Sequence, residues 1–303
     1  MIEYAPYQLT QKSALNRMDL SAVREGVLIR VDGNKYACIH PWPELGDSTL
    51  AECLSDLRAG NENPLVARAL YAAEQFGQFV EDAPKIQSHA TLPKLNGTPV
   101  LEAVDAEFQG VKVKRGKDWV RLRKKTEAFI KGYPCLRWRF DFNGAMKSHR
   151  ELSQFLGWHP RAQIDFIEDP FDDTTLADSW RGFPIAYDRV IPEQLNLEQN
   201  FLIAKPALQS LEEIDELATG FSQKVVFTSY MDHPVGQLFA LQEAQRFYKK
   251  HGIETPPLCG LATQDLYEAT PYHALLGASN PMLEHPPIAE LIWLLEKEDW
   301  QVL

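Results

Sequence analysis

The chain has 303 residues, of which 45% are hydrophobic and 24% are charged, an ordinary composition for a globular protein. This length allows one large α/β domain with a smaller domain beside it and a substantial core. The net charge of −11 argues against nucleic acid or an anionic membrane surface as a partner, because both bind basic surfaces.

The hydrophobic and cysteine patterns exclude other classes of protein. No apolar run reaches the length of a membrane span, and the first segment, MIEYAPYQLTQK, contains acidic Glu3 and lacks the apolar core of a signal peptide. The cysteines form no CxxC pair, which argues against a disulfide framework or a zinc site. They are Cys38, Cys53, Cys135 and Cys259. We therefore expect a reduced protein of the cytoplasm.

The first eighty or so residues predict a small α+β domain. The segments VLIRV (27–31) and KYACIH (35–40) favour strands, and Asp32-Gly33-Asn34 between them is typical of a tight hairpin turn. One helix is predicted to begin at the capping box Thr49-Leu-Ala-Glu52. A second is predicted to begin at Asn63-Pro64, which combines a cap with a proline in the first helical turn.

From about residue 85, short apolar strands alternate with helices. Ser148-His-Arg-Glu151 and Ser210-Leu-Glu-Glu213 are capping boxes, and PVGQLFALQEAQRFYKKHG has apolar residues at helical spacing. Strands that alternate with helices predict a parallel sheet, and eight strands close a barrel. The main competitor, a doubly wound open sheet, lacks its Gly-rich phosphate turn. The eight candidate strands are QSHATLP, GVKVKRG, LRWRFDFNG, IDFIEDP, IAYD, FLIAKP, KVVFTSY and LCGLATQ.

Polar residues gather near the carboxyl ends of these strands, which meet at one mouth of a barrel. Taken singly each signal is weak, because an Asp at a strand end often caps a turn and a lone lysine often reaches solvent. Together they place carboxylates on successive strands, with lysines on the strands before and after. The residues are Lys112, Lys114, Asp141, Asn143, Glu168, Asp169, Asp188, Lys205, Ser229 and Asp232.

Acidic groups brought close together repel one another unless a cation lies among them. Because oxygen ligands without nearby His or Cys favour a hard ion, Mg²⁺ is the predicted ion. Three carboxylates carry three negative charges, and the ion supplies two positive charges. A carboxylate substrate would therefore make the site more negative still. Lys114 and Lys205 across the mouth would offset that charge.

The segment GVKVKRG places Lys112 and Lys114 on the same side of one strand, about 6.6 Å apart. At an effective dielectric constant near 20, two such charges repel by roughly 2.5 kcal/mol, or nearly two pKa units. Lys112 is therefore predicted to lower the pKa of Lys114 towards neutrality, which would make Lys114 a usable general base. The alternative is a strand whose lysines simply reach solvent.

Five motifs occur in order at the spacing of successive βα units: Lys112-Val-Lys114, Asp141-Phe-Asn143, Glu168-Asp-Pro170, Asp188 and Lys205-Pro206. This pattern resembles the muconate-lactonizing branch of the enolase superfamily. Residues 24–57 also resemble the capping domain of that branch, including the loop that closes over substrate. The resemblance implies an α/β fold, with a modified (β/α)7β TIM-type barrel over residues 85–275 and an N-terminal α+β capping domain over residues 1–84. We expect residues 276–303 to pack back on the capping domain.

Within this branch the chain is most similar to the o-succinylbenzoate synthases of menaquinone biosynthesis. Arg139 in RFDFN matches an R-x-D-x-N pattern of some of these enzymes, and GLATQDLY resembles their G-L-x-T segment. N-acylamino acid racemases and dipeptide epimerases share the framework and form the alternative. A barrel hydrolase with two carboxylates would leave Lys114 and Lys205 without a role. A barrel that only binds a ligand is a further possibility.

The resemblance implies a role for each matching residue. Lys114 would remove the α-proton of a cyclohexadiene carboxylate, the small-molecule substrate, and Lys205 would stay protonated beside the enediolate, with Lys112 in support. Loss of hydroxide would then give the aromatic product. The implied Mg²⁺ ligands are Asp141, Glu168 and Asp188, and the candidate substrate contacts are Arg139, Asn143 and Ser229.

Two positions and one loop depart from the usual pattern of the family. Arg189 follows Asp188 where a Glu is usual, so an acid beside the metal site is missing or comes from elsewhere. Asp169 stands where Glu is commoner. The capping loop reads HPWPELGD, which differs from the P-L-P-G-F-S type of loop in many relatives.

Overall fold

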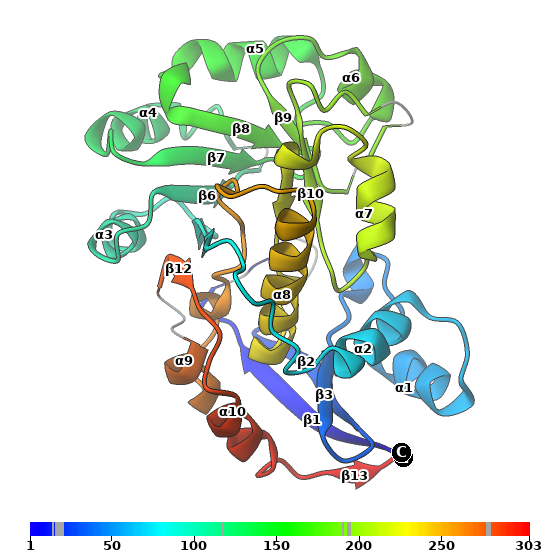
Figure 1. Cartoon of the computed structure of the whole chain (residues 1–303). Coiled ribbons are helices and arrows are strands. Elements are labelled where there is room, and N and C mark those ends of the chain that lie inside the picture. Colours follow the sequence, from blue (N-terminus) through cyan, green and yellow to red (C-terminus); the bar gives the residue numbers. More distant parts are fainter. Residues whose placement is uncertain (14, 16–20, 117, 190, 193–194, 277–279) are drawn as a thin grey trace.

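The computed structural model describes residues 1–13, 15, 21–116, 118–189, 191–192, 195–276 and 280–303 (Figure 1). Within these residues the strands form a four-stranded sheet in the order β13-β1-β2-β3, a seven-stranded sheet in the order β11-β10-β9-β8-β7-β6-β5, and a β12-β4 pair. The two larger sheets lie at opposite ends of the molecule, with the long helix α8 (Pro234–Lys250) reaching from one toward the other (Figure 1).

The N-terminal part is the predicted α+β unit. Its elements are β1 (Ile2–Thr10), β2 (Val23–Val31), β3 (Lys35–Ile39), η1 (Pro43–Leu45), α1 (Leu50–Ala59) and α2 (Pro64–Glu74). The hairpin between β2 and β3 is confirmed, and its turn holds Asp32 at φ 51° and Gly33 at φ 83°. Both helix starts are confirmed as well: Thr49 and Glu52 form a full capping box, and the Asn63 side chain caps α2.

The seven-stranded sheet is parallel throughout, as predicted. Its strands are β5 (Ala90–Leu92), β6 (Gly110–Lys114), β7 (Arg137–Asp141), β8 (Ile164–Glu168), β9 (Ile185–Tyr187), β10 (Phe201–Ala204) and β11 (Val225–Phe227). The helices between them are α3 (Gly97–Asp105), α4 (Arg123–Gly132), α5 (His149–Trp158), α6 (Thr174–Ser179) and α7 (Leu211–Leu217), with short η2 (Arg161–Gln163) and η3 (Ser222–Lys224).

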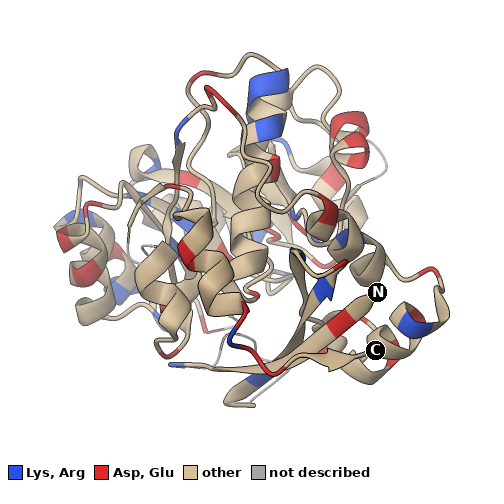
Figure 2. Ribbon diagram, turned by 60° about the horizontal axis from the view of Figure 1, so that its bottom comes forward, with Lys and Arg blue, Asp and Glu red and all other residues tan. Residues whose placement is uncertain are grey.

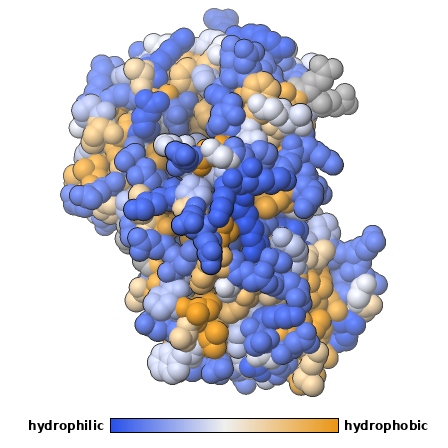
Figure 3. All heavy atoms as spheres, in the orientation of Figure 1, coloured by the Kyte–Doolittle hydropathy of each residue, from blue (hydrophilic) through white to orange (hydrophobic). Residues whose placement is uncertain are grey.

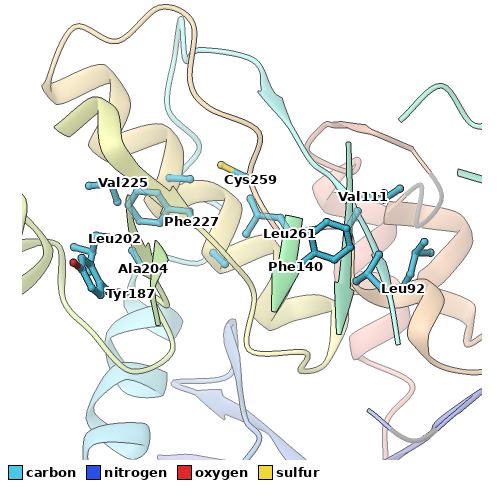
Figure 4. Packing of buried hydrophobic residues seen from close by; sticks show 14 of the residues in the cluster. Leu92, Val111, Phe140, Tyr187, Leu202, Ala204, Val225, Phe227, Cys259 and Leu261 are labelled. Atoms are coloured by element: carbon cyan, nitrogen blue, oxygen red, sulfur yellow. The ribbon is translucent and has the colours of Figure 1, made fainter. Parts of the chain in front are cut away.

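The two edges of this sheet approach the same short segment. Cys259 forms a parallel bridge to Ser88, just before β5, and Gly260 forms one to Thr228, just after β11. In Figure 4, Cys259 and Leu261 lie between the side chains of β10 and β11 and those of β5 to β7. The predicted eighth strand, LCGLATQ, is thus present as isolated bridges and not as a full strand. The described residues between β9 and β10 also hold no helix, so the expected (β/α)7β count is not reproduced in full.

The C-terminal part of the chain pairs with the first strand. It contains η4 (Gln264–Leu266), α9 (Pro271–Leu276), β12 (Met282–Leu283), α10 (Ile288–Leu295) and β13 (Gln301–Val302). β12 pairs with β4 (Ile86–Gln87), and β13 pairs antiparallel with β1. The predicted domain limits at residues 84 and 275 stay a prediction.

Two buried hydrophobic clusters hold these parts together. The larger one fills the parallel sheet and its helices, and the smaller one joins the N-terminal sheet to Tyr230 and to Phe239 of α8. Charged residues of both signs are spread over many elements (Figure 2), and the face shown in Figure 3 is mainly hydrophilic with smaller hydrophobic groups. None of the helices in the described residues combines the length and the hydrophobicity that a membrane span requires.

A buried carboxyl group lies where the N-terminal sheet meets α8. Asp232 is 3% exposed, its Oδ2 lies 4.0 Å from Sγ of Cys38, and its Oδ1 has no hydrogen-bond partner among the described residues. A Cβ atom at Gly236 would lie 2.1 Å from Oδ2, so this close approach requires glycine. Burial raises the pKa of Asp232 to about 7.

We expect Asp232→Asn to remove a pH-dependent loss of stability. Above pH 4 the unfolded chain releases the Asp232 proton, whereas the fold keeps it until the pH approaches 7. The free energy of unfolding of the wild type should therefore fall by about 3 kcal/mol between pH 5 and pH 8 because of this group, and the variant should lack that fall. Urea unfolding at both pH values measures it. The exposed Asp105→Asn should behave as the wild type; equal pH dependence in all three proteins contradicts the prediction.

Candidate active site

A cavity of about 1420 Å³ opens at the carboxyl ends of the parallel strands. Most of the predicted site residues line it: Lys112, Lys114, Asp141, Asn143, Asp188, Lys205 and Ser229. Leu15, Glu44 and Leu45 line it from the N-terminal part, so the segment that carries η1 covers the strand ends. The structure thus brings Lys114, at the end of β6, and Lys205, just after β10, into one cavity.

Lys112 is bound by carboxylates. Its Nζ lies 2.8 and 3.1 Å from the two carboxylate oxygens of Glu168 and 3.6 Å from Oδ2 of Asp141. Burial alone would lower the pKa of Lys112, but the charges of Glu168, Asp141 and Asp188 outweigh burial and raise it. Lys112 is therefore a fixed ammonium group at the centre of the acids, and the alternative of two lysines reaching solvent is wrong for this residue.

Lys114 lies closer to the N-terminal part of the chain. Its Nζ donates a hydrogen bond of 2.7 Å to the carbonyl oxygen of Leu15. Burial is the largest cause that lowers the pKa of Lys114; the ammonium groups of Lys112 and Lys205 lower it further, and Asp141 and Glu168 oppose them. The predicted direction is confirmed, but the predicted cause is corrected, because Lys112 is paired with acids and acts less strongly than burial.

The first two acids sit side by side on neighbouring strands. Asp141 at the end of β7 is the register partner of Glu168 at the end of β8. The Asn143 side chain donates a hydrogen bond of 2.7 Å to Oδ1 of Asp141, and the Asn143 backbone bends back at φ 45° to allow it. Glu168 lies behind Lys112 and is 1% exposed. Burial raises the pKa of Glu168 to about 7, with Asp141 and Asp188 adding to the rise and Lys112 opposing it.

The third acid is tied to the second lysine. Asp188, just after β9, accepts from Lys205 at 2.6 and 2.7 Å. Burial would raise the pKa of Asp188, but Lys205 and Lys112 hold it below its usual value. Asp169 accepts the backbone N–H groups of Asp188 and Arg189 at 3.0 and 2.9 Å. Asp169 therefore supplies a carboxylate that positions this strand end, where Arg189 replaces the usual Glu.

Arg139 lies below the cavity and is not among the described residues that line it. Its guanidinium donates to Oδ2 of Asp165 at 2.7 and 2.8 Å, to Nδ1 of His89 at 2.8 Å and to the carbonyl oxygen of Leu258 at 2.7 Å. The register shift beside Arg139 leaves Asp165 without a pairing partner, which lets it reach this side chain. The geometry gives Arg139 a supporting position and does not support the predicted contact with substrate.

Ser229 is part of a polar wall that sequence reasoning described only in part. Its Oγ lies 2.6 Å from Oγ1 of Thr263, and both residues line the cavity. His89, Thr228 and Gly260 line the same side and were not predicted. The only local signal was a histidine within the strand segment QSHATLP, which carries no information about the partners that it meets from distant parts of the chain.

Comparison with known proteins identifies the family. Residues 2–78 match the model of the O-succinylbenzoate synthase N-terminal domain. The chain is also 30% identical over 310 residues to the o-succinylbenzoate synthase of Bdellovibrio bacteriovorus, covering 93% of this chain and 92% of that protein. The chain belongs to the o-succinylbenzoate synthase family. The predicted resemblance to the enolase superfamily is thereby confirmed.

Solved structures show the same fold at lower identity. A dipeptide epimerase from Enterococcus faecalis, complexed with Mg and the dipeptide L-Leu-L-Tyr, has a TM-score of 0.72 at 13% identity, over 93% of this chain and 96% of that one. An enolase family member from Agrobacterium tumefaciens with homology to dipeptide epimerases has a TM-score of 0.69 at 17% identity, over 95% and 98% of the two chains. At these identities the likeness shows the fold alone.

Asp141, Glu168 and Asp188 offer this member of the o-succinylbenzoate synthase family a donor set that suits Mg²⁺. All three donors are carboxylates on adjacent strands, and an ammonium group, that of Lys112, already serves as the cation between Glu168 and Asp141. With these ion pairs in place, no three Asp, Glu, His or Cys side chains in the described part of the chain are arranged to hold a metal. The carboxylate donors are thus of the type that Mg²⁺ prefers, while in this structure Lys112 and Lys205 are paired with them.

Proposed function

We propose that this protein is an o-succinylbenzoate synthase, a Mg²⁺-dependent dehydratase that converts a 2-succinyl-6-hydroxy-cyclohexadiene carboxylate to o-succinylbenzoate in menaquinone biosynthesis. The synthase of Bdellovibrio bacteriovorus supports the choice of substrate. The observation that carries the proposal is the position of the two lysines. Lys114 on β6 and Lys205 after β10 enter one cavity, and the strands between them carry the three acids.

Lys114 is the base in this proposal. Burial lowers its pKa and so favours the neutral amine, and its position at the cavity wall lets it take the proton next to the substrate carboxylate. When that C–H bond breaks, its electron pair moves onto the carboxylate oxygens. The ammonium group of Lys205 faces the growing negative charge and offsets it, as a preorganised cation in a water-poor site does.

The second half of the reaction returns the proton. Lys114, now protonated, donates a proton to the departing hydroxyl group, so that the C–O bond breaks and water leaves. The electron pair goes into the ring, which becomes aromatic. The net change is the loss of one water molecule, and the enzyme regains its starting protonation state.

The remaining site residues would hold the metal ion or keep its ligands in position. Asp141, Glu168 and Asp188 would hold Mg²⁺, which when bound supplies positive charge to the substrate carboxylate. Asn143 keeps Asp141 in place, and Lys112 forms an ion pair with Glu168. The barrel of this proposal is the modified (β/α)7β form, in which the Cys259–Gly260 bridges stand for the last strand, and the N-terminal α+β part serves as its cap.

The direct test is turnover of the synthase substrate. We expect the full chain with Mg²⁺ to produce the aromatic product, followed by its ultraviolet absorbance, and EDTA to stop the reaction until excess Mg²⁺ is added. Calorimetric titration with MgCl₂ measures metal binding in the absence of substrate. Asp141→Asn should weaken that binding at least tenfold, because it removes one charged ligand. No turnover by the wild type with Mg²⁺ contradicts the proposal.

A second activity is consistent with the same geometry. Two lysines that face one cavity from opposite strands can exchange a proton on either face of a substrate, which is what racemization or epimerization of an N-acylamino acid or dipeptide requires. Exchange of deuterium from solvent into an N-acylamino acid, without turnover of the synthase substrate, would favour this alternative.

A further inference from the structure

His89 is a buried histidine that the proposed reaction does not use. It lies between β4 and β5, is 1% exposed and lines the cavity. Its Nδ1 lies 2.8 Å from Nη1 of Arg139. Its Nε2 has no hydrogen-bond partner in the described residues. A buried N–H group without a partner is costly, which makes this atom a candidate for contact with a ligand.

Arg139 determines which nitrogen of His89 carries the proton. A guanidinium has only donors, so Nδ1 of His89 must accept the hydrogen bond and cannot itself bear hydrogen. Burial, together with the charges of Arg139 and Lys112, holds the pKa of His89 well below its usual value, so the ring is neutral. The single proton is therefore on Nε2, and Asp165 fixes the orientation by binding the same guanidinium.

A glycine lets His89 and Thr228 pack close to the chain at residue 260. A Cβ atom at Gly260 would lie 3.1 Å from Nε2 and 2.9 Å from Cε1 of His89, and 2.7 Å from Cγ2 of Thr228. The Thr228 hydroxyl is the second buried polar atom here that lacks a partner among the described residues. Two hydrogen-bonding groups, those of His89 and Thr228, thus lie beside a glycine in the cavity wall. We call His89, Thr228 and Gly260 the polar notch.

The notch and the acids belong to different strand ends. Gly260 bridges to the segment after β11, and its neighbour Cys259 bridges to the segment before β5, whereas the acids follow β7, β8 and β9 in the middle of the seven-stranded order. This difference in strand leaves the notch to a part of the substrate other than the carboxylate that faces the acids. Neutral donors backed by a guanidinium suit an oxygen that accepts hydrogen bonds.

We propose that the polar notch of His89, Thr228 and Gly260 is a specificity site that binds an oxygen of the substrate's succinyl arm through Nε2–H of His89. This inference rests on the proposed function, because that function supplies the succinyl arm. Arg139 acts through His89 as a positioning residue. The structure does not support the predicted direct contact of Arg139 with substrate.

Two amide substitutions at His89 test its donor, Nε2–H, separately from Nδ1, which accepts from Arg139. The amide of Asn reaches the position of Nδ1, so His89→Asn keeps an acceptor for Arg139 and lacks the donor in the notch. The amide of Gln reaches the position of Nε2, so His89→Gln restores that donor. Calorimetry with Mg²⁺-loaded protein compares o-succinylbenzoate with benzoate, which lacks the succinyl arm. We expect His89→Asn to weaken o-succinylbenzoate binding about tenfold or more, and His89→Gln less than about threefold.

Benzoate binding should be the same in all of these proteins, and Thr228→Val should weaken only o-succinylbenzoate. His159→Gln is the matched control, because His159 is also buried with unpartnered ring nitrogens but does not line the cavity. Equal loss of both ligands, or equal loss in His89→Asn and His89→Gln, would overturn the inference and leave a structural role. So would unchanged o-succinylbenzoate binding by His89→Asn.

Nitrogen-15 NMR of the histidine rings gives a readout that does not depend on turnover. We expect His89 to show hydrogen on Nε2 and none on Nδ1 in the free protein, and the Nε2–H signal to shift when o-succinylbenzoate binds. Hydrogen on Nδ1, or a signal unchanged by the ligand, overturns the inference. If the wild type forms product but the His89 tests fail, the inference alone is wrong; if the wild type neither forms nor binds the product, both proposals are wrong.

Discussion

Replacing Lys114 by Met is expected to lower kcat for dehydration by about 10²- to 10⁴-fold, the range that general acid–base groups supply. Met keeps much of the length and the apolar stem of lysine but cannot accept or return a proton. Mg²⁺ binding should be retained, because Lys114 contacts the carbonyl oxygen of Leu15 and, among the described residues, no acid at hydrogen-bond distance. Steady-state kinetics with calorimetric Mg²⁺ titration measures both quantities.

Lys94→Met is the matched control, since Lys94 lines the same cavity but is exposed and follows β5 at the edge of the sheet. It should keep nearly full activity. Wild-type kcat should rise with pH until Lys114 is neutral, because a base acts only when deprotonated, and the midpoint should lie below the ordinary lysine pKa of about 10.4. A Lys114→Met variant with more than a tenth of wild-type kcat contradicts the role of base.

The elements that the sequence predicts well are those with local signals. The β2–β3 turn, the α1 capping box and the Asn63 cap all depend on residues within a few positions of one another. β1 was not predicted, although it pairs with β2 along nine residues, because IEYAPYQLT has a proline and no clear alternation. β13 and the bridges at Cys259 and Gly260 form only through partners from distant parts of the chain.

The same distinction between local signals and distant contacts explains which features of the site could be predicted. Strand alternation predicts that Lys112 and Lys114 share a side, and the structure places both at the cavity. It cannot predict that Glu168, 56 residues further on, pairs with Lys112, and this pairing weakens the repulsion between Lys112 and Lys114. The notch was missed for a related reason: His89 and Gly260 come together only when the two edges of the sheet approach each other.

Lys205 distinguishes the two reactions that the framework can support. In dehydration only its positive charge is needed, whereas epimerization needs it to give and take a proton. We expect Lys205→Ala to lower kcat for dehydration by about 10²- to 10³-fold, as loss of one charge-stabilising group does, and Lys205→Arg to lower it less. Because arginine does not lose its proton near neutral pH, Lys205→Arg should abolish any epimerase activity.

Magnesium affinity shows whether Lys205 acts through its contact with Asp188 or through the substrate. Lys205 holds Asp188 at 2.6 Å, so Lys205→Ala leaves that carboxylate without its nearest cation. If Asp188 binds Mg²⁺, the variant should bind the ion at least as tightly as the wild type, even though its kcat is low. Low kcat with intact Mg²⁺ binding then assigns the ammonium group to the substrate. Weakened Mg²⁺ binding together with low kcat would instead mean that Lys205 only keeps Asp188 in position, and the proposed stabilisation of substrate charge would be wrong.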